Sequence, residues 1–231
     1  MHAPDELITK VLKAWHFLYK RGFIEGFGHI SARLPDDPEL FLLARHSLGP
    51  RANPEDFLIV DMKGRIASGK GTIPGEYPIH LEILRARPDI GSAFHYHGLH
   101  STAFSTSEHR LRAIHLMGTL FHDGIPIYED PRLVSNPDRG VALAKALGPH
   151  RAVLLRAHGA AITGADVEEC VGGTFLFEEN ARRAHTAASM GKPIWIDDKL
   201  AADAGGELLK SRGPFKRVWA LVESDSEQMN E

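Results

Sequence analysis

The sequence predicts an α/β domain whose central sheet is mixed and largely antiparallel, with helices on both of its faces. Segments with helical periodicity and apolar runs of strand length are mixed along the chain, which is typical of layered α/β domains. Several predicted strands follow one another through short turns, and such turns join antiparallel strands. No repeat, low-complexity linker or shift in composition marks a boundary. We therefore predict one domain over 1–222 and a frayed acidic tail over 223–231.

The amino-terminal part is predicted to begin with a helix and to continue with strands. Pro4–Arg21 carries apolar residues at spacings of three and four, and Gly22 stands where such a helix would stop. The next predicted elements are a glycine turn running into a strand over 26–34, strands at Leu40–Ala44 and Asp56–Asp61, a turn at Met62–Arg65, a short strand at Ile66–Ala67, a helix at Pro74–Arg87 and a strand at Asp89–Tyr96.

The carboxyl-terminal part is predicted to be richer in helix. The expected elements are a short helix at Ser101–Thr106, a strand at Ile125–Tyr128, a helix at Pro137–Leu147, strands at Ala152–Leu155 and Ala160–Thr163, a long helix at Asp166–Met190, and weaker helices at Leu200–Lys210 and Pro214–Val222. Asn136 suits the N-cap of the helix that starts at Pro137, and Gly148 suits its end.

The composition is that of an ordinary globular protein and argues against several kinds of partner. Apolar residues make up 43% and charged residues 25%, and the formal net charge is -3 without a basic block, so nucleic acid is not an expected partner. The only cysteine, Cys170, permits no internal disulfide. The first 15 residues lack the apolar core of a signal peptide, and no apolar run approaches the roughly 20 residues of a membrane span. We therefore expect a cytoplasmic protein without a membrane partner.

A His-x-His pair near the middle of the chain is the first candidate for a metal site. His95 and His97 end a predicted strand just before Gly98. Residues two apart on a strand point to the same side, so both imidazoles can reach one ion. The alternative is that the two are unrelated polar residues at the end of a strand.

Two further residues strengthen the metal hypothesis. His158 is a polar residue between two apolar runs, where an unpartnered imidazole would be costly. Three histidines with an open fourth position are typical of a catalytic metal site. Glu76 stands near the start of a predicted helix, four residues before His80, and its carboxylate can complete the coordination or carry a proton. The alternatives are a satisfied core histidine and an exposed acid favoured by the helix dipole.

Four ordered motifs resemble the class II aldolase/adducin family. They are Gly26–Arg33; Pro54–Asp61 with the turn at Gly64; Glu76–His80 with Arg87–Ile90 and His95–His97; and Arg156–Gly159, together spanning about residues 7 to 190. The resemblance implies a three-layer α/β/α sandwich, commonly in a homotetramer. It also implies one divalent metal ion per chain on His95, His97 and His158, with Glu76 as a ligand or an acid/base. Zinc suits these ligands best, and manganese, cobalt or iron are also acceptable.

Departures from the family's sugar-phosphate aldolases indicate a different substrate. Those aldolases have an asparagine where His29 stands, a Thr/Ser-Gly turn where 44–47 stands, and a Ser-Ser pair where 74–75 stands. The groups that would hold a phosphate are mostly absent here. Arg45 can instead pair with a planar carboxylate, with His46 and Ser47 as further substrate contacts. The alternative for Arg45 is a surface salt bridge.

The pattern resembles a decarboxylase branch of the family. Its members act on dihydroxyphthalate-type catechol acids or on carboxy-hydroxymuconic semialdehydes from aromatic degradation. We therefore predict a metal-dependent, non-oxidative decarboxylase of a small carboxylated molecule, with Glu76, then His115 and His29, as candidate proton donors. Two alternatives stay open: a class II aldolase that cleaves a hydroxy-aldehyde or sugar phosphate, and a non-catalytic, adducin-like oligomeric scaffold.

Overall fold

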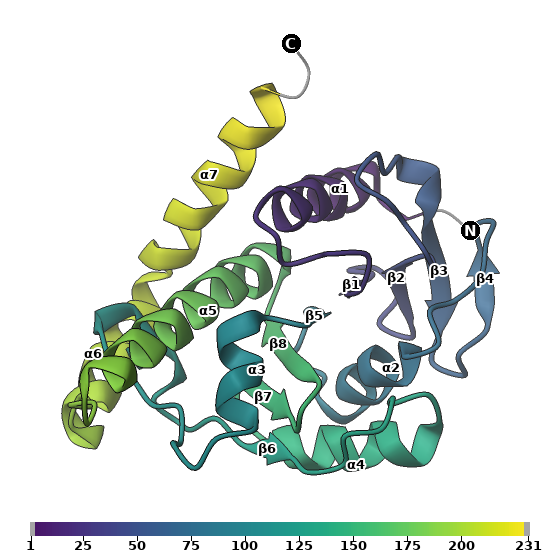
Figure 1. Cartoon of the computed structure of the whole chain (residues 1–231). Helices are drawn as coiled ribbons and strands as arrows, with labels where there is room; N and C mark the ends of the chain where they lie inside the picture. Colours follow the sequence, from purple (N-terminus) through teal and green to yellow (C-terminus); the bar gives the residue numbers. More distant parts are fainter. Residues whose placement is uncertain (1–2, 229–231) are drawn as a thin grey trace.

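The computed structural model describes residues 3–228 and has an eight-stranded sheet at its centre (Figure 1). The strands are β1 (His29–Arg33), β2 (Leu40–Ala44), β3 (Phe57–Asp61), β4 (Ile66–Ser68), β5 (Ser92–Tyr96), β6 (Ile127–Tyr128), β7 (Ala152–Leu155) and β8 (Gly159–Gly164). Their order is β4-β3-β2-β1-β5-β8-β7-β6. The β6–β7 pair is parallel and the other six pairs are antiparallel, which confirms the predicted mixed, largely antiparallel sheet.

Helices cover both faces of this sheet and make the predicted three-layer α/β/α sandwich (Figure 1). They are α1 (Asp5–Lys20), α2 (Tyr77–Ala86), α3 (Leu99–Ser105), α4 (Pro137–Leu147), α5 (Val167–Met190), α6 (Asp198–Ser211) and α7 (Gly213–Gln228), with short 3-10 helices η1 (Pro54–Asp56) and η2 (Leu116–Phe121). The sheet separates two apolar cores because alternate residues of a strand point to opposite faces. On β2, Phe41 and Leu43 pack with α2 and α4, whereas Leu42 and Ala44 pack with α1 and α5.

Capping side chains explain where several helices begin. The Asn136 side chain accepts a hydrogen bond from the Arg139 amide at 3.0 Å, as the sequence predicted for α4. Asp197 caps the backbone of α6, which therefore begins two residues before the predicted Leu200. The helix predicted over Pro74–Arg87 begins only at Tyr77, and 74–76 form an irregular segment that lies at the site described below.

The predicted frayed tail is wrong for residues 223–228, because α7 continues to Gln228. Asp225 of α7 accepts hydrogen bonds from Lys20 at 2.8 Å and from Arg21 at 3.0 Å, at the end of α1. These two ion pairs join the last helix to the first, a contact between distant segments that periodicity cannot predict. Residues 229–231 lie outside the described part of the chain.

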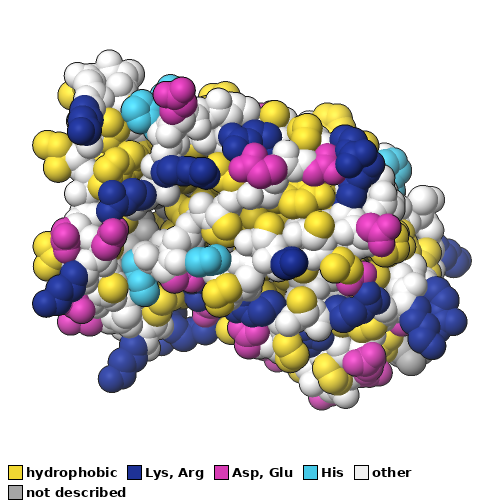
Figure 2. Space-filling model, turned by 90° about the horizontal axis from the view of Figure 1, so that it is seen from below, with side chains coloured by type: hydrophobic (Ala, Val, Ile, Leu, Met, Phe, Trp, Pro, Cys, Tyr) yellow, Lys and Arg dark blue, Asp and Glu magenta, His cyan; other side chains and the backbone are white. Residues whose placement is uncertain are grey.

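The surface seen in Figure 2 carries acidic and basic side chains interspersed among apolar ones, rather than one large basic patch. Within residues 3–228, no helix combines the length and apolar character that a membrane crossing requires.

Candidate metal centre

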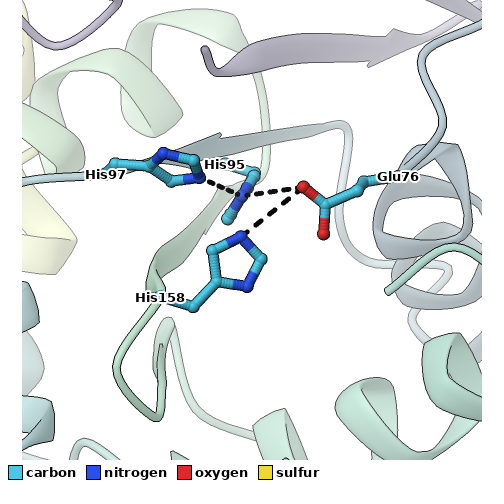
Figure 3. A group of neighbouring side chains, drawn as sticks. All are labelled: Glu76, His95, His97 and His158. Carbon is cyan, nitrogen blue, oxygen red and sulfur yellow. Dashed lines mark hydrogen bonds and ion pairs between the residues drawn. The ribbon is translucent and has the colours of Figure 1, made fainter. Parts of the chain in front are cut away.

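Four side chains converge at one end of the sheet: Glu76, His95, His97 and His158 (Figure 3). One ligand atom from each lies within 4.8 Å of the others. The Nε2 atoms of His95 and His97 are 3.2 Å apart. Glu76 Oε2 lies 3.5 Å from His158 Nε2 and 3.8 Å from His95 Nε2. The structure thus brings together the three predicted histidines and the predicted carboxylate.

The strand β5 delivers two of these ligands in the way its alternation predicts. His95 is fully buried on the face covered by α2, and His97 follows directly after the strand. Tyr96 points to the opposite face, where its hydroxyl donates to Glu178 of α5 at 3.0 Å. This anchor fixes the end of β5, and so fixes the two imidazoles on either side of Tyr96.

His158 reaches the cluster from the tight turn between β7 and β8. Ala157, just before it, has a positive φ of 53°, and the His158 amide donates to Leu155 O at 3.1 Å. Gly159 opens β8, where an added Cβ would collide with the Tyr96 carbonyl and lie 3.0 Å from the ring of His97. The turn and β5 therefore approach so closely that only glycine fits between them.

Glu76 holds its carboxylate between the histidines and a neighbouring loop. Oε1 accepts a hydrogen bond from the Val134 amide at 2.9 Å, which leaves Oε2 facing His95 and His158. Burial alone would raise the pKa of this carboxyl group, but the adjacent His158 and His95 outweigh burial and lower the pKa to about 2. Glu76 is therefore an anion near neutral pH.

The donor set fits a divalent cation. His95 Nδ1 donates to the Ala160 carbonyl at 3.0 Å, so the lone pair of His95 Nε2 faces the cluster. Burial, followed by the neighbouring histidines, also lowers the pKa of His95 and of His97, so both rings are neutral and able to ligate. Both ring nitrogens of His158 are buried and lack a hydrogen-bond partner within residues 3–228. A metal ion would satisfy Nε2, the His158 nitrogen that faces Glu76, since neutral imidazole and carboxylate are ligands of zinc and related ions.

A cavity of about 470 Å³ opens beside this cluster. Its lining includes the predicted site residues His29, Arg45, His46, Ser47, Glu76 and His97. They come from β1, from the segment after β2, from the segment before α2 and from the end of β5. The predicted substrate-contact segment and the predicted metal ligands therefore share one cavity. A larger cavity, of about 700 Å³, lies near η1 and has no histidine in its lining.

Arg45 combines the two interpretations that its sequence left open. Its Nε donates to Asp56 Oδ1 at 2.7 Å, so it does form a salt bridge. Arg45 nevertheless lines the cavity, and its ion pair with Asp56 restricts the orientation of its side chain. Asp56 cannot be recognised as this partner from the sequence, because only the pairing of β2 with β3 places Arg45 and Asp56 together.

Phe27 is an aromatic residue that lines the cavity. Its side chain is 69% exposed, which excludes a core position. Its ring stacks on His97, with centroids 5.7 Å apart and an interplanar angle of 25°. The face of a flat ring thus borders the cavity directly beside a predicted metal ligand.

His115 is not brought into the cavity by this chain. Its Nδ1 lies 3.3 Å from Asn180 Oδ1 of α5, at the N-terminal boundary of η2, and it is absent from the cavity lining. The sequence placed His115 beside the substrate by resemblance alone, and within residues 3–228 the packing of η2 on α5 separates it from the metal cluster.

His29 does lie in the site, where it borders the cavity and leans against His95. The two rings are 5.3 Å apart, because β1 and β5 pair in the register His29–His95. Its Nδ1 is 2.6 Å from Nε2 of His80, a buried residue of α2. The spacing of four residues relates His80 to Glu76, whereas the contact of His80 with His29 depends on the packing of α2 on the sheet.

A Gly159→Ala substitution is expected to weaken metal binding without removing a ligand. The new methyl group would displace the end of β5 and with it His97. Disturbing the support of a metal ligand costs on the order of 10- to 100-fold in affinity. Zinc titration against a competing chelator measures the loss, and Gly206→Ala, which introduces no contact, is the control. Unchanged zinc affinity in Gly159→Ala would contradict the close approach described here.

Comparisons with known proteins agree with this architecture. The 3,4-dihydroxyphthalate decarboxylase of Arthrobacter keyseri is 33% identical over 175 residues, covering 68% of this chain and 69% of that protein. The corresponding enzyme of Rhodococcus jostii (strain RHA1) is 30% identical over 205 residues, covering 81% and 83%. The L-fuculose phosphate aldolase of Methanococcus vannielii is 28% identical and covers 80% and 99%.

A solved structure and a family model extend the comparison to the fold. The L-fuculose 1-phosphate aldolase from Glaciozyma antarctica PI12 has a TM-score of 0.84 at 21% identity, covering 96% of this chain and 90% of that one. At this identity the likeness concerns the fold. The model of the Class II Aldolase and Adducin N-terminal domain matches residues 9–185. The chain therefore belongs to the class II aldolase and adducin family.

Proposed function

We propose that the protein is a metal-dependent, non-oxidative decarboxylase of a catechol carboxylate, such as a dihydroxyphthalate, or of a carboxy-hydroxymuconic semialdehyde. The observation that carries the proposal is that Arg45 and the Glu76–histidine cluster border the same cavity. An arginine beside a metal-ligating cluster suits a substrate with both a carboxylate and neighbouring oxygens. The two relatives named 3,4-dihydroxyphthalate decarboxylases support this substrate class.

In this proposal Arg45 orients a substrate carboxylate. Asp56 accepts from Nε, and the His46 carbonyl accepts from Nη1 at 3.4 Å, so Nη2 is the group proposed to contact a ligand in the cavity. His46 and Ser47 border the same region and provide further polar contacts. Ser47 has a φ of 55°, which shows that the segment bends sharply where it meets the cavity.

His95, His97 and His158 would hold the divalent ion, with Glu76 as the adjacent carboxylate. When bound, such an ion would supply a Lewis acid, which stabilises negative charge that develops on substrate oxygen when CO2 departs. The low pKa of Glu76 has a consequence for its predicted function as proton donor. Its Oε2 must first accept a proton, for which a substrate hydroxyl is the proposed source, and then deliver it to the carbon that lost CO2.

Two alternatives use the same fold. An aldolase would need the same cluster, and the fuculose-phosphate aldolase relative supports it. However, Pro74 and Gly75 line the cavity without side-chain hydroxyls that could bind a phosphate. A non-catalytic scaffold would have no need for four converging ligand atoms.

Product analysis of the zinc- or manganese-loaded protein separates these functions. We expect CO2 release from a catechol dicarboxylate, with little cleavage of a hydroxy-aldehyde phosphate. The opposite preference would replace the decarboxylase proposal with the aldolase. Absence of both activities in protein that does not retain stoichiometric metal would favour the scaffold.

An Arg45→Ala variant is expected to lose 100- to 1000-fold in kcat/KM for a carboxylated substrate, roughly the 3–4 kcal/mol that a desolvated, charge-assisted pair contributes. Metal content should stay unchanged, because Arg45 is not a ligand. Steady-state kinetics and elemental analysis measure the two quantities. Arg65→Ala is the matched control, since Arg65 pairs with Asp61 away from the cavity. Wild-type kinetics in Arg45→Ala would exclude the proposed carboxylate contact.

The proposed assembly is a cytoplasmic homotetramer with sites near subunit boundaries, on the strength of the family resemblance. Light scattering should then give a mass close to four times the 25.5 kDa of one chain. A mass of 25.5 kDa at micromolar concentration would contradict a stable tetramer. It would also mean that a single chain forms the whole site.

A further inference from the structure

Beneath the cavity, a chain of hydrogen bonds runs from the middle of the sheet to His29. Ser31 and His80 are fully buried, and His29 is 9% exposed where it borders the cavity. Ser31 Oγ lies 2.7 Å from His80 Nδ1, and His80 Nε2 lies 2.6 Å from His29 Nδ1. None of the three belongs to the cluster of candidate metal ligands.

The carbonyl of Ala93 determines the direction of this chain. It accepts the hydrogen bond that Ser31 Oγ donates at 3.4 Å. A hydroxyl group has a single hydrogen, so toward His80 the Ser31 oxygen can only accept, and His80 Nδ1 must carry a hydrogen. Burial lowers the pKa of His80 to about 3, so the ring is neutral and its other nitrogen is bare. The bare Nε2 of His80 can only accept, and His29 must donate to it from Nδ1.

We propose that Ser31 and His80 hold His29 as the tautomer with its hydrogen on Nδ1, so that His29 Nε2 presents a lone pair to the cavity and accepts a hydrogen bond from a substrate hydroxyl. His80 is the positioning residue, and His29 is the residue that touches substrate. The sequence alone allowed His29 to be a proton donor, but in this tautomer its cavity-facing nitrogen is an acceptor.

This arrangement selects a chemical class of substrate. A substrate hydroxyl beside the predicted metal ligands can donate a hydrogen bond to His29 Nε2. A methoxy or carbonyl oxygen has no hydrogen to donate, so its lone pair would be repelled by the lone pair of Nε2. A catechol or an enol satisfies the requirement. The identity of the hydroxyl-bearing substrate rests on the proposed function, whereas the tautomer of His29 does not.

Nuclear magnetic resonance of zinc-loaded protein with 15N-labelled histidine tests the tautomer directly. Two-bond proton–nitrogen correlations show which ring nitrogen carries the hydrogen, and the signal lost in His29→Asn assigns His29. We expect hydrogen on Nδ1 in the wild type and in His80→Gln, whose amide oxygen can accept in place of the imidazole. His80→Leu should populate the other tautomer. Hydrogen on Nε2 in the wild type, or an unchanged tautomer in His80→Leu, would overturn the inference.

Calorimetric binding tests the consequence with 3,4-dihydroxybenzoate and its two mono-methyl ethers as probes. Methylation also disturbs chelation, but it does so equally in wild type and variant, so the ratio of affinities isolates His29. The preference for the dihydroxy probe over at least one ether should fall by about tenfold in His80→Leu and return in His80→Gln. An equal preference in all three proteins would overturn the hydroxyl contact. If His80→Leu does not fold, the tautomer of His29 in the wild type is by itself the test of the inference.

The two proposals fail differently. The first case is that no carboxylated substrate releases CO2, whereas His29 carries hydrogen on Nδ1 and the protein binds the dihydroxy probe more tightly than the ethers. The decarboxylase proposal then fails and the tautomer inference stands. If CO2 is released but His29 carries hydrogen on Nε2, the reverse holds.

Discussion

Replacement of His97 by alanine is expected to abolish nearly all activity, lowering kcat/KM by at least about a thousandfold. The reason is that His97 Nε2 lies 3.2 Å from His95 Nε2 and is one of only three imidazoles in the cluster. Two histidines and a carboxylate bind a divalent ion less tightly, and the Lewis-acid contribution of several kcal/mol is lost with it. Metal content measured by mass spectrometry should fall well below one ion per chain.

His100→Ala is the matched control for this variant. His100 follows three residues later, pairs with His185 on the surface and contributes no atom to the cluster. It should retain metal and activity. The wild-type protein should also gain melting temperature on addition of zinc, whereas His97→Ala should gain much less, because a ligand stabilises only the state that binds it. Full activity of His97→Ala after chelation would rule out the proposed metal site.

The second large effect is expected from Glu76→Gln, which should lower kcat by about 10²- to 10⁴-fold while leaving substrate binding nearly intact. Glutamine keeps an oxygen that can accept from the Val134 amide, so the loop should stay in place. It cannot accept the substrate proton at the position of Oε2, between His95 and His158. Single-turnover CO2 release and substrate titration separate turnover from affinity.

Metal content must be measured in the same Glu76→Gln preparation. The expected metal content differs according to whether Glu76 ligates the metal or only carries a proton. Retained metal with lost turnover indicates proton transfer, and lost metal indicates ligation. Glu55→Gln is the control, because Glu55 is exposed and lies in η1, away from the cluster. A Glu76→Gln enzyme with wild-type kcat would remove Glu76 from the mechanism.

The sequence by itself predicted the layered fold and the four residues of the candidate metal cluster. Alternation along β5 was enough to place His95 and His97 together and Tyr96 away from them, because a strand has a fixed period of two. Strand-length runs joined by short turns were enough to predict a mostly antiparallel sheet. Arg45, His46 and Ser47 were identified from local departures in the motif, and they do border the cavity.

Only the tertiary structure decided which distant side chains become partners. Strand register places His29 against His95, and the packing of α2 on the sheet places His80 beneath His29. Long-range contacts also place His115 beside Asn180, away from the cavity. Another such contact, between Asp225 and Lys20, joins α7 to the end of α1. Local periodicity reports the direction of a side chain relative to its own backbone. The partners it meets, and therefore its tautomer and charge, depend on contacts across the sheet and between layers, which no single segment contains.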